Sequence, residues 1–375
     1  MTSDDELTAL KRMVSMFAVR HIAPRTDLND LLLLPADLRQ AMAQEGLYGI
    51  GIPVAHGGMG GGWLHMGVSG QAFVENGHNL GTALSWLMHS VIARFLFFGF
   101  GSDEQKNLFL PEIAKGTKIP CLAISEPGVG GHPKRLSTVA REHGGVYRIS
   151  GEKAYLTNGP IADLFIVLAV TAQEGERKSY TAFIVDRDTP GLKMTGPLDL
   201  GFLKPCPHGG IVLDGCEVDS SRILGRVGHA YTDMALPFRQ VEDIMMMGPL
   251  VGGVRAQIAL LAASMKGRGV QPGSDVAALL GEVVSSADSL EILSREAAAK
   301  LDSSGIGHPG LVSLVLFMRN VAQGIQTGLT DIVGKTQVAT DRAFASLAAD
   351  LTASMRIAGN VARIRQEKLG ISILS

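Results

Sequence analysis

The side chains best able to do chemistry gather in one stretch, CLAISEPGVGGHPKRLSTVAREHGGVYRISGEKAYLTNG, which covers residues 121–159. It runs from an apolar segment through a Ser-Glu-Pro turn to Gly130 and Gly131, and then to a strand with Tyr155 and Thr157. A glycine-lined turn followed by a small sheet with an aromatic residue suits a ligand site. The simpler interpretation is that Ser-Glu-Pro-Gly is only a β-turn and Tyr155 a core aromatic, and the isolated motif leaves both open.

Other patterns argue against several kinds of site. The three cysteines, Cys121, Cys206 and Cys216, have neither metal-binding spacing nor an even disulfide framework, which predicts no metal site and fits a reducing, cytoplasmic compartment. The segment GGMGGGW has no strand before it and no Walker lysine. We therefore interpret it as a loop rather than a phosphate cradle.

The overall composition of the chain limits the classes of partner that we expect. A net charge of -2 offers no electrostatic footprint for nucleic acid or an anionic membrane. Hydrophobic residues make up 46% of the chain and charged residues 19%, so we expect part of the apolar surface to be buried between subunits. The start, MTSDDELTALKRM, is acidic and begins a helix rather than a signal peptide. No apolar run reaches the roughly 18 residues of a membrane span.

Three regions that differ in their apolar spacing and turn signals predict an α+β chain of three domains. Residues 1–118 show apolar side chains at helical spacing and predict a helical domain. Residues 119–226 alternate short β-rich runs with turn signals and predict an antiparallel β-barrel or sandwich. Residues 227–375 hold four long helical segments with apolar stripes and predict a four-helix bundle.

This order of domains, with AISEPGVGG at the start of the β-domain, resembles the acyl-CoA dehydrogenase family of flavoproteins over essentially the whole chain. The family usually reads Thr-Glu-Pro-x-Ala-Gly-Ser-Asp and then Asn-Gly-x-Lys-x-Trp-Ile-Thr-Asn, where this chain reads SEPGVGGH and ISGEKAYLTNG. The segment FGFGSDEQKNLFLPEIAKG is also similar to the family's Gly-x-x-x-Gln-Lys-x-x-Leu-Pro.

The resemblance implies bound FAD and assigns residues to it. Tyr155 stands where a Trp usually packs against the isoalloxazine ring, and Thr157 where a hydroxyl reaches flavin N5. Ser125 would bond the carbonyl edge of the ring. The residues expected along the cofactor are Leu122, Ile124, Ser125, Gly130, Gly131, Tyr155 and Thr157.

Some family positions differ here. Gly131 replaces a Ser that usually contacts substrate, and His132 replaces an Asp. The Arg-x-x-Phe-Gly segment, which reaches the adenosine side of a neighbouring subunit's flavin, is reduced to Arg268, which is out of place. Of the later Gln-x-x-Gly-Gly-x-Gly segment, only Gly334 and Lys335 remain. Arg268 and Gly334 are therefore weaker cofactor-binding candidates.

The family's reaction needs a carboxylate that takes the α-proton of a thioester while the β-hydrogen leaves as hydride to flavin N5. The usual Glu precedes a glycine near the C-terminus, but the matching stretch RIAGNVARI has Ala358 there and Asn360 at the Thr position, where we expect a cofactor contact. A minority of the family carries its base on the first bundle helix. Counting back ten residues from Gly252 gives Glu242, with Asp243 where an Arg is common.

Glu242 is therefore the candidate base, while the simpler interpretation of RQVEDI is a solvated helical turn in which Glu242 pairs with Arg239. Glu75 and Glu126 are weaker alternatives, and Glu126 is better explained as a structural carboxylate of the turn.

The expected function is FAD-dependent oxidation of an acyl-CoA to the 2,3-enoyl-CoA in fatty acid metabolism, with electron-transferring flavoprotein as acceptor. The expected assembly is a homodimer or homotetramer, or a hetero-oligomer with a paralogue. One alternative is a half-site or non-catalytic subunit of a heteromeric dehydrogenase. Another is different flavin chemistry on the same scaffold, such as desulfination, oxidation or hydroxylation.

Overall fold

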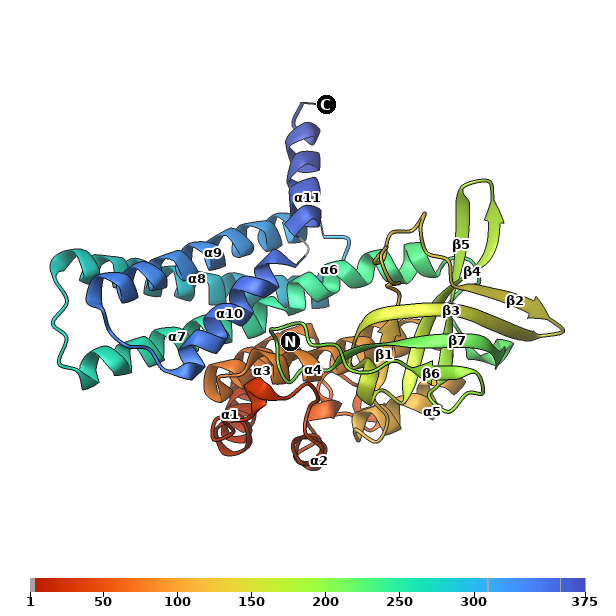
Figure 1. The fold of residues 1–375 in the computed structure, drawn as a ribbon, viewed down its shortest axis with the longest axis horizontal. Helices are drawn as coiled ribbons and strands as arrows, with labels where there is room; N and C mark the ends of the chain where they lie inside the picture. Colours follow the sequence, from red (N-terminus) through yellow and green to blue (C-terminus); the bar gives the residue numbers. More distant parts are fainter. Residues whose placement is uncertain (1–3, 309, 358, 375) are drawn as a thin grey trace. The chain divides into compact units, whose positions relative to one another are not determined.

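The computed structural model describes residues 4–308, 310–357 and 359–374, including every side chain among these except that of residue 360. Helices come first, a sheet follows and helices return (Figure 1), which confirms the expected order. The first helices are α1 (Asp4–His21), α2 (Ala36–Gln44), α3 (Trp63–Gly77), α4 (Leu80–Val91) and α5 (Asp103–Ala114). The last are α6 (Leu236–Met245), α7 (Met247–Gly267), α8 (Ser274–Ser304), α9 (Gly310–Thr336), α10 (Arg342–Arg356) and α11 (Gly359–Ser372).

The strands form one sheet. They are β1 (Pro120–Ala123), β2 (Val139–His143), β3 (Val146–Thr157), β4 (Leu164–Glu174), β5 (Arg177–Asp186), β6 (Leu192–Met194), β7 (His208–Asp219) and β8 (Ile223–Leu224). Two π-helical segments, η4 (Ile92–Phe98) and η7 (Tyr231–Ala235), lead out of α4 and into α6.

The described chain divides into two compact units, each assembled from separate pieces of sequence. One unit holds Met1–Asn29, Trp63–Ala83 and Asp243–Ser375, and the other holds Asp30–Gly62 and Leu84–Glu242. Because these units follow packing rather than sequence order, the three-domain division at residues 118 and 226 stays a prediction.

In the first unit, α7 packs closely along α3, and glycines allow the approach. A Cβ added at Gly248 would overlap the carbonyl oxygen of Gly67, and one at Gly252 would overlap that of Gln71. A side chain at either position would therefore force the two helices apart.

The same unit contains the expected C-terminal bundle, in which α7, α8, α9 and α10 pack against one another. Four long helical segments were expected in residues 227–375, and the prediction of the last was wrong in one respect, because that segment is divided into α10 and α11. Helix α10 ends at Arg356, the backbone of the next residue, Ile357, is extended (φ -57°, ψ 134°), and α11 begins at Gly359. Glycine is a poor residue for a helix interior, which fits a boundary at this point.

The second unit is built around the sheet, with strand order β6-β7-β3-β2-β4-β5-β8 and β1 paired to β4. Most pairs are antiparallel as expected, but β1–β4 and the short β2–β4 contact are parallel, so the sheet is mixed. The long connection from β1 to β4 lets the chain return in the same direction. A buried apolar cluster that includes Phe165, Phe183 and Ile211 stabilises the sheet.

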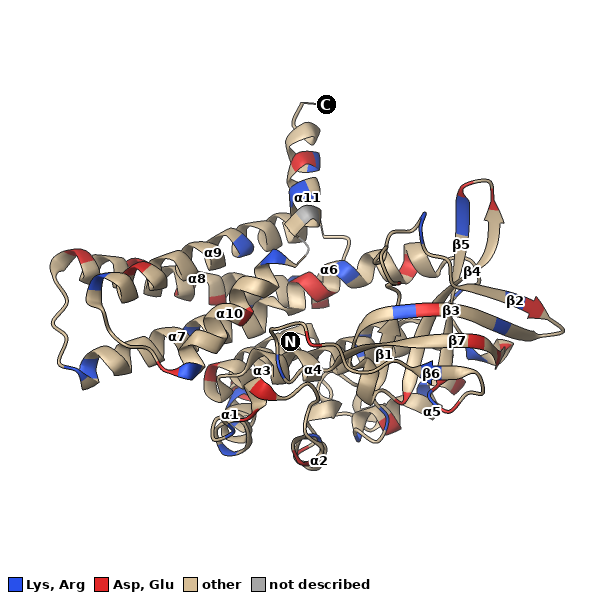
Figure 2. Ribbon diagram, in the orientation of Figure 1, with Lys and Arg blue, Asp and Glu red and all other residues tan. Residues whose placement is uncertain are grey.

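Charged residues of both signs are interspersed along the helices and strands, while α4 carries none (Figure 2). Two helical stretches of the described chain, Leu80–Phe98 and Tyr231–Gly267, are apolar and long enough to cross a membrane. Most of each is buried inside the protein, 89% and 72% of the most apolar window, as is common for core helices.

Candidate active site

The predicted cofactor stretch lines a cavity of about 170 Å³ that lies entirely within the second unit. Its walls come from β1 and the turn after it, the end of β3, α4 with η4, and η7 with the first part of α6. Both π-helical segments contribute to it, and such segments often occur at functional sites. The predicted residues in its lining are Leu122, Ile124, Ser125, Gly131, Tyr155 and Thr157, and Glu242 faces them from α6.

Tyr155 lies in an irregularity of β3. The pairing of β3 with β7 shifts register between Lys153 and Leu156, and Tyr155 itself has a left-handed backbone with φ 59°. Its side chain is 57% exposed, although its neighbour Leu156 is buried. A β-bulge re-aims a side chain out of the ladder, and a non-glycine residue in this conformation carries strain that typically marks a functional site.

Thr157 ends the same strand and is paired with a histidine. Thr157 and His208 are direct partners across β3 and β7, and the Thr157 hydroxyl lies 3.2 Å from Nε2 of His208. Nδ1 of His208 lies 3.0 Å from the carbonyl oxygen of Cys206. Burial lowers the pKa of His208, so the imidazole is neutral at pH 7.

The end of β3 is also fixed to α4. Asn158 donates from Nδ2 to the carbonyl oxygen of Ser85 at 2.8 Å, and the Ser85 hydroxyl donates to Oδ1 of Asn158 at 2.6 Å. Both residues are buried. This pair of hydrogen bonds holds the cavity-facing end of the strand in place.

Glu126 is a structural carboxylate, as its place in the turn predicted. It is 3% exposed, and its oxygens accept from Lys153 Nζ at 3.0 Å and from the backbone N–H groups of Ser137 and Thr138 at 2.7 and 2.9 Å. Burial raises the pKa of Glu126, but Lys153 and these donors outweigh burial and lower that pKa to about 2. A carboxylate held ionised by four such contacts, counting the Ser137 hydroxyl at 2.8 Å, is a poor general base.

The glycine-rich turn is held by two tyrosines. The Tyr180 hydroxyl donates to the carbonyl oxygen of Pro133, and the Tyr231 hydroxyl donates to that of Gly131 at 3.4 Å. Gly130 does not line the cavity, but its backbone is left-handed (φ 59°) and the space where its Cβ would lie is open. A Cβ at Gly131 would meet Ile124 at 3.6 Å, so only the space beside Gly130 is open, and the cofactor contacts expected of both glycines stay predictions.

Glu242 is half-buried and shares its wall of the cavity with Arg239, one helical turn earlier. The glycine from which it was counted, Gly252, has a packing reason to be glycine, namely its contact with Gln71. Asp243, the next residue, forms an ion pair with Arg365 of α11. Neighbouring carboxylates on α6 thus have different surroundings, and only Glu242 lines the cavity.

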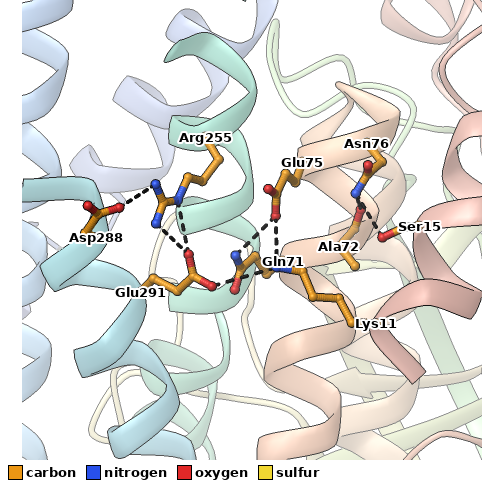
Figure 3. Close-up of polar contacts among 9 residues, drawn as sticks. All are labelled: Lys11, Ser15, Gln71, Ala72, Glu75, Asn76, Arg255, Asp288 and Glu291. Carbon is orange, nitrogen blue, oxygen red and sulfur yellow. Dashed lines mark hydrogen bonds and ion pairs between the residues drawn. The ribbon is translucent and has the colours of Figure 1, made fainter. Parts of the chain in front are cut away.

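Glu75, the other alternative base, belongs to a polar network in the first unit (Figure 3). Gln71 Nε2 donates to Glu75 at 3.2 Å and Lys11 Nζ lies 3.5 Å from it. The network continues through Glu291 to Arg255 at 2.8 Å. Glu75 is therefore engaged in packing between helices.

The candidates for the adenosine side lie elsewhere. Arg268 follows the last turn of α7 and Gly334 lies on α9; both are exposed, both belong to the first unit, and neither lines the cavity. Lys335 pairs with Asp275 at 2.8 Å. The side chain of Asn360 and residue 358 lie outside the described residues. The cofactor contacts of these residues stay predictions.

The sequence matches two models of one protein family. The model of the acyl-CoA dehydrogenase N-terminal domain matches residues 4–117, and that of the middle domain matches residues 121–216. The chain belongs to the acyl-CoA dehydrogenase family of oxidoreductases.

Individual relatives agree with this assignment. An acyl-CoA dehydrogenase of Bacillus subtilis (strain 168) is 28% identical over 74% of this chain and 72% of its own. An L-prolyl-[peptidyl-carrier protein] dehydrogenase of Pseudomonas fluorescens is 33% identical over 49% of each chain. The crystal structure of a glutaryl-CoA dehydrogenase from Mycobacterium smegmatis in complex with FADH2 superimposes with a TM-score of 0.82 at 20% identity, covering 95% of this chain and 91% of that one.

The sequence did not predict three contacts at the cavity. These are the contact of His208 with Thr157, the hydrogen bond of Tyr231 to Gly131, and the hydrogen bonds between Asn158 and Ser85. His208 could be found only by aligning β3 with β7, because its partner Thr157 is 51 residues earlier. The segment PHGG, with which β7 begins, carries no recognisable motif.

Proposed function

We propose that this chain binds FAD in the cavity and oxidises the Cα–Cβ bond of an acyl thioester to the 2,3-enoyl thioester, with Glu242 as the base. The observation that carries the proposal is the convergence of two separate predictions on one cavity. The flavin-side residues Tyr155 and Thr157 were predicted from a strand motif, and Glu242 from its distance to a helix glycine, yet all three line the same space.

The residues present fit a flavin. Tyr155 offers an exposed aromatic face to a flat ring. Among the described strands β1 pairs only with β4, so the backbone groups on its other edge are available for the polar edge of a ring. Ser125 and Thr157 add hydroxyl groups to the lining. Bound FAD would supply the acceptor for the β-hydrogen and its electron pair.

Glu242 has the chemistry of the remaining role. A carboxylate on a helix, half-buried beside the apolar side chains of Met88, Ile92 and Phe238, can take a proton from carbon if substrate binding excludes water. Arg239 at the same wall is exposed and can orient an anionic part of the substrate.

An anaerobic titration of the FAD-reconstituted protein tests this function. We expect loss of flavin absorbance on adding one member of a panel of short, branched, cyclic and steroid-like acyl-CoA thioesters. A protein that takes up no FAD, or whose flavin no thioester in the panel bleaches, would contradict the proposal.

Family membership supports two finer proposals, electron-transferring flavoprotein as the acceptor and a homo-oligomer as the assembly. The three cysteines, which have no disulfide framework, support the cytoplasm as the proposed location.

A second candidate is favoured by Ala358, since alanine stands where most of the family has the catalytic Glu. In this case the chain is one subunit of a heteromeric dehydrogenase and a paralogue completes the site. Size measurement of the purified chain separates the two candidates. A flavin-loaded homo-oligomer that acyl thioester reduces rules out the heteromer, whereas flavin uptake only on co-expression with a paralogue favours it.

A further inference from the structure

The contact between Thr157 and His208 determines the direction of a hydrogen bond at the cavity wall. A backbone carbonyl oxygen can only accept, so the contact of His208 Nδ1 with the Cys206 oxygen at 3.0 Å places the ring proton on Nδ1. In a neutral imidazole Nε2 is then an acceptor. The Thr157 hydroxyl, 3.2 Å away, must donate to it.

In this arrangement the single proton of the Thr157 hydroxyl is used in the hydrogen bond to His208 and cannot be donated to a ligand. Its oxygen keeps lone pairs, and Thr157 lines the cavity that Tyr155 and Ser125 share. An acceptor is thus presented to any ligand atom opposite Thr157, although an isolated threonine can serve as donor or acceptor.

Two other protonation states would reverse the direction, and both are disfavoured. A proton on Nε2 would set the Nδ1 lone pair against the lone pairs of the Cys206 carbonyl. A doubly protonated ring would free the Thr157 proton, but His208 is 8% exposed and burial lowers its pKa. In the described part of the chain, the hydrogen-bonding partners of the ring are the Thr157 hydroxyl and the Cys206 carbonyl oxygen, and neither is a carboxylate that could offset burial.

We propose that His208 is a positioning residue that makes the Thr157 hydroxyl a hydrogen-bond acceptor toward the cavity and thereby favours the reduced form of the bound cofactor. The inference rests on the proposed FAD site. Flavin N5, the atom that a hydroxyl at position 157 is expected to reach, has a lone pair in the oxidised form and an N–H in the reduced form. An acceptor opposite such a nitrogen stabilises only the reduced form, and a donor would stabilise the oxidised form.

The midpoint potential of bound FAD, measured by photoreduction against reference dyes, tests the sign of this effect. We expect Thr157→Val to lower the ratio of reduced to oxidised flavin at fixed potential at least tenfold, which is about 30 mV for a two-electron couple. His208→Leu should lower it at least as far, because the freed hydroxyl can then donate to the oxidised ring. The double variant should match Thr157→Val, since no hydroxyl is left to orient.

Two further variants serve as controls. Thr157→Ser keeps the hydroxyl and should keep the wild-type potential. Thr171→Val removes a strand hydroxyl that hydrogen-bonds to Thr181 at 2.9 Å and lies outside the cavity lining, and it should also leave the potential unchanged.

The outcomes separate this inference from the function on which it rests. A rise or no change in potential in Thr157→Val overturns the inference, as does an unchanged potential in His208→Leu. If His208→Leu does not fold, the sign measured in Thr157→Val decides alone. Wild-type protein that takes up no FAD overturns the proposed function itself.

Discussion

At the scale of the residue, Tyr155 combines a strained backbone with an exposed aromatic ring at the cavity, and the two facts belong together. The left-handed conformation costs of the order of 1–2 kcal/mol for a residue with a Cβ. Local stability does not explain the presence of a tyrosine at this position, because glycine would adopt the left-handed conformation with less strain. We attribute it to the ring, which the bulge turns toward the cavity proposed to hold FAD.

The variant Tyr155→Gly tests this explanation. We expect the free energy of unfolding of the apoprotein to stay within about 1 kcal/mol of wild type, because relief of strain offsets the flexibility of glycine. FAD affinity should fall roughly threefold to tenfold, the value of one aromatic contact of about 0.5–1.5 kcal/mol. Fluorescence titration with FAD measures it. The control Tyr155→Phe keeps the ring and should bind FAD with wild-type affinity. If Tyr155→Gly binds FAD as tightly as the wild type, the explanation is refuted.

Some of the residues around the cavity could be predicted from the sequence, and others could not. Tyr155 and Thr157 could be proposed because they follow a continuous strand motif. His208 could not, because its importance arises from the register of two strands far apart in sequence. Glu242 required a reference point, and Gly252 served because close helix packing permits no larger residue there.

At the scale of the element, the buried pair of Lys153 and Glu126 fixes β3 to the turn after β1. Lys153 is fully buried and donates to both the Ile124 carbonyl and Glu126. This contact sets how the two cavity-lining segments lie against each other, so its loss should affect both folding and cofactor binding.

Removing either Lys153 or Glu126 alone should lower the free energy of unfolding more than removing both. We expect Lys153→Met to lower the free energy of unfolding by about 3–5 kcal/mol, because it leaves a buried carboxylate without its cation. The double variant Lys153→Met/Glu126→Met should recover part of this loss. Urea denaturation of all three variants, with Glu126→Met as the second single variant, completes the cycle. A cost below about 1 kcal/mol for Lys153→Met would show that the pair is not needed.

The same pair predicts a pH dependence. The folded-state pKa of Glu126 is lowered from 4.5 to about 2. Its contribution to stability is therefore complete above pH 4.5 and is lost as the pH falls from 4.5 toward 2. Glu126→Gln should flatten the stability profile across this interval in denaturation series. The exposed Glu152→Gln on the same strand should not, and an unchanged slope in Glu126→Gln would contradict the assignment.

Some features of the elements are beyond sequence patterns. Turn signals between short β-rich runs were expected in residues 119–226, and one of them is the hairpin turn of β2 and β3, where Gly144 and Gly145 both have positive φ as such a turn requires. The parallel pairing of β1 with β4 was missed, because pairing between distant strands leaves no local signal. The break after Arg356 was missed because no proline marks it.

At the scale of the whole molecule, the two compact units interleave along the sequence. The first unit joins N-terminal helices α1 and α3 to the C-terminal helices, with the glycine contacts of α7 against α3. The network of Figure 3 ties these same helices together: Lys11 on α1 lies 3.8 Å from Glu291 on α8, which pairs with Arg255 on α7.

This interleaving predicts that the C-terminal helices do not fold alone. A fragment of residues 243–375 lacks α1 and α3, so the face of α7 around Gly248 and Gly252 and the pair of Arg255 and Glu291 lose their cover. We expect weak helical circular dichroism and no cooperative thermal transition under conditions in which the full chain unfolds cooperatively. A sharp transition in the fragment would show that the bundle is an independent domain.

The central claim is that Glu242 removes the substrate proton beside a flavin held at Tyr155 and Thr157. The most direct measurement is the anaerobic visible spectrum of the FAD-loaded Glu242→Gln variant mixed with an acyl-CoA that bleaches the wild type. The account predicts a normal oxidised flavin spectrum and a rate of bleaching at least a hundredfold slower, with the exposed control Glu152→Gln behaving as wild type. Bleaching of Glu242→Gln at the wild-type rate would contradict it.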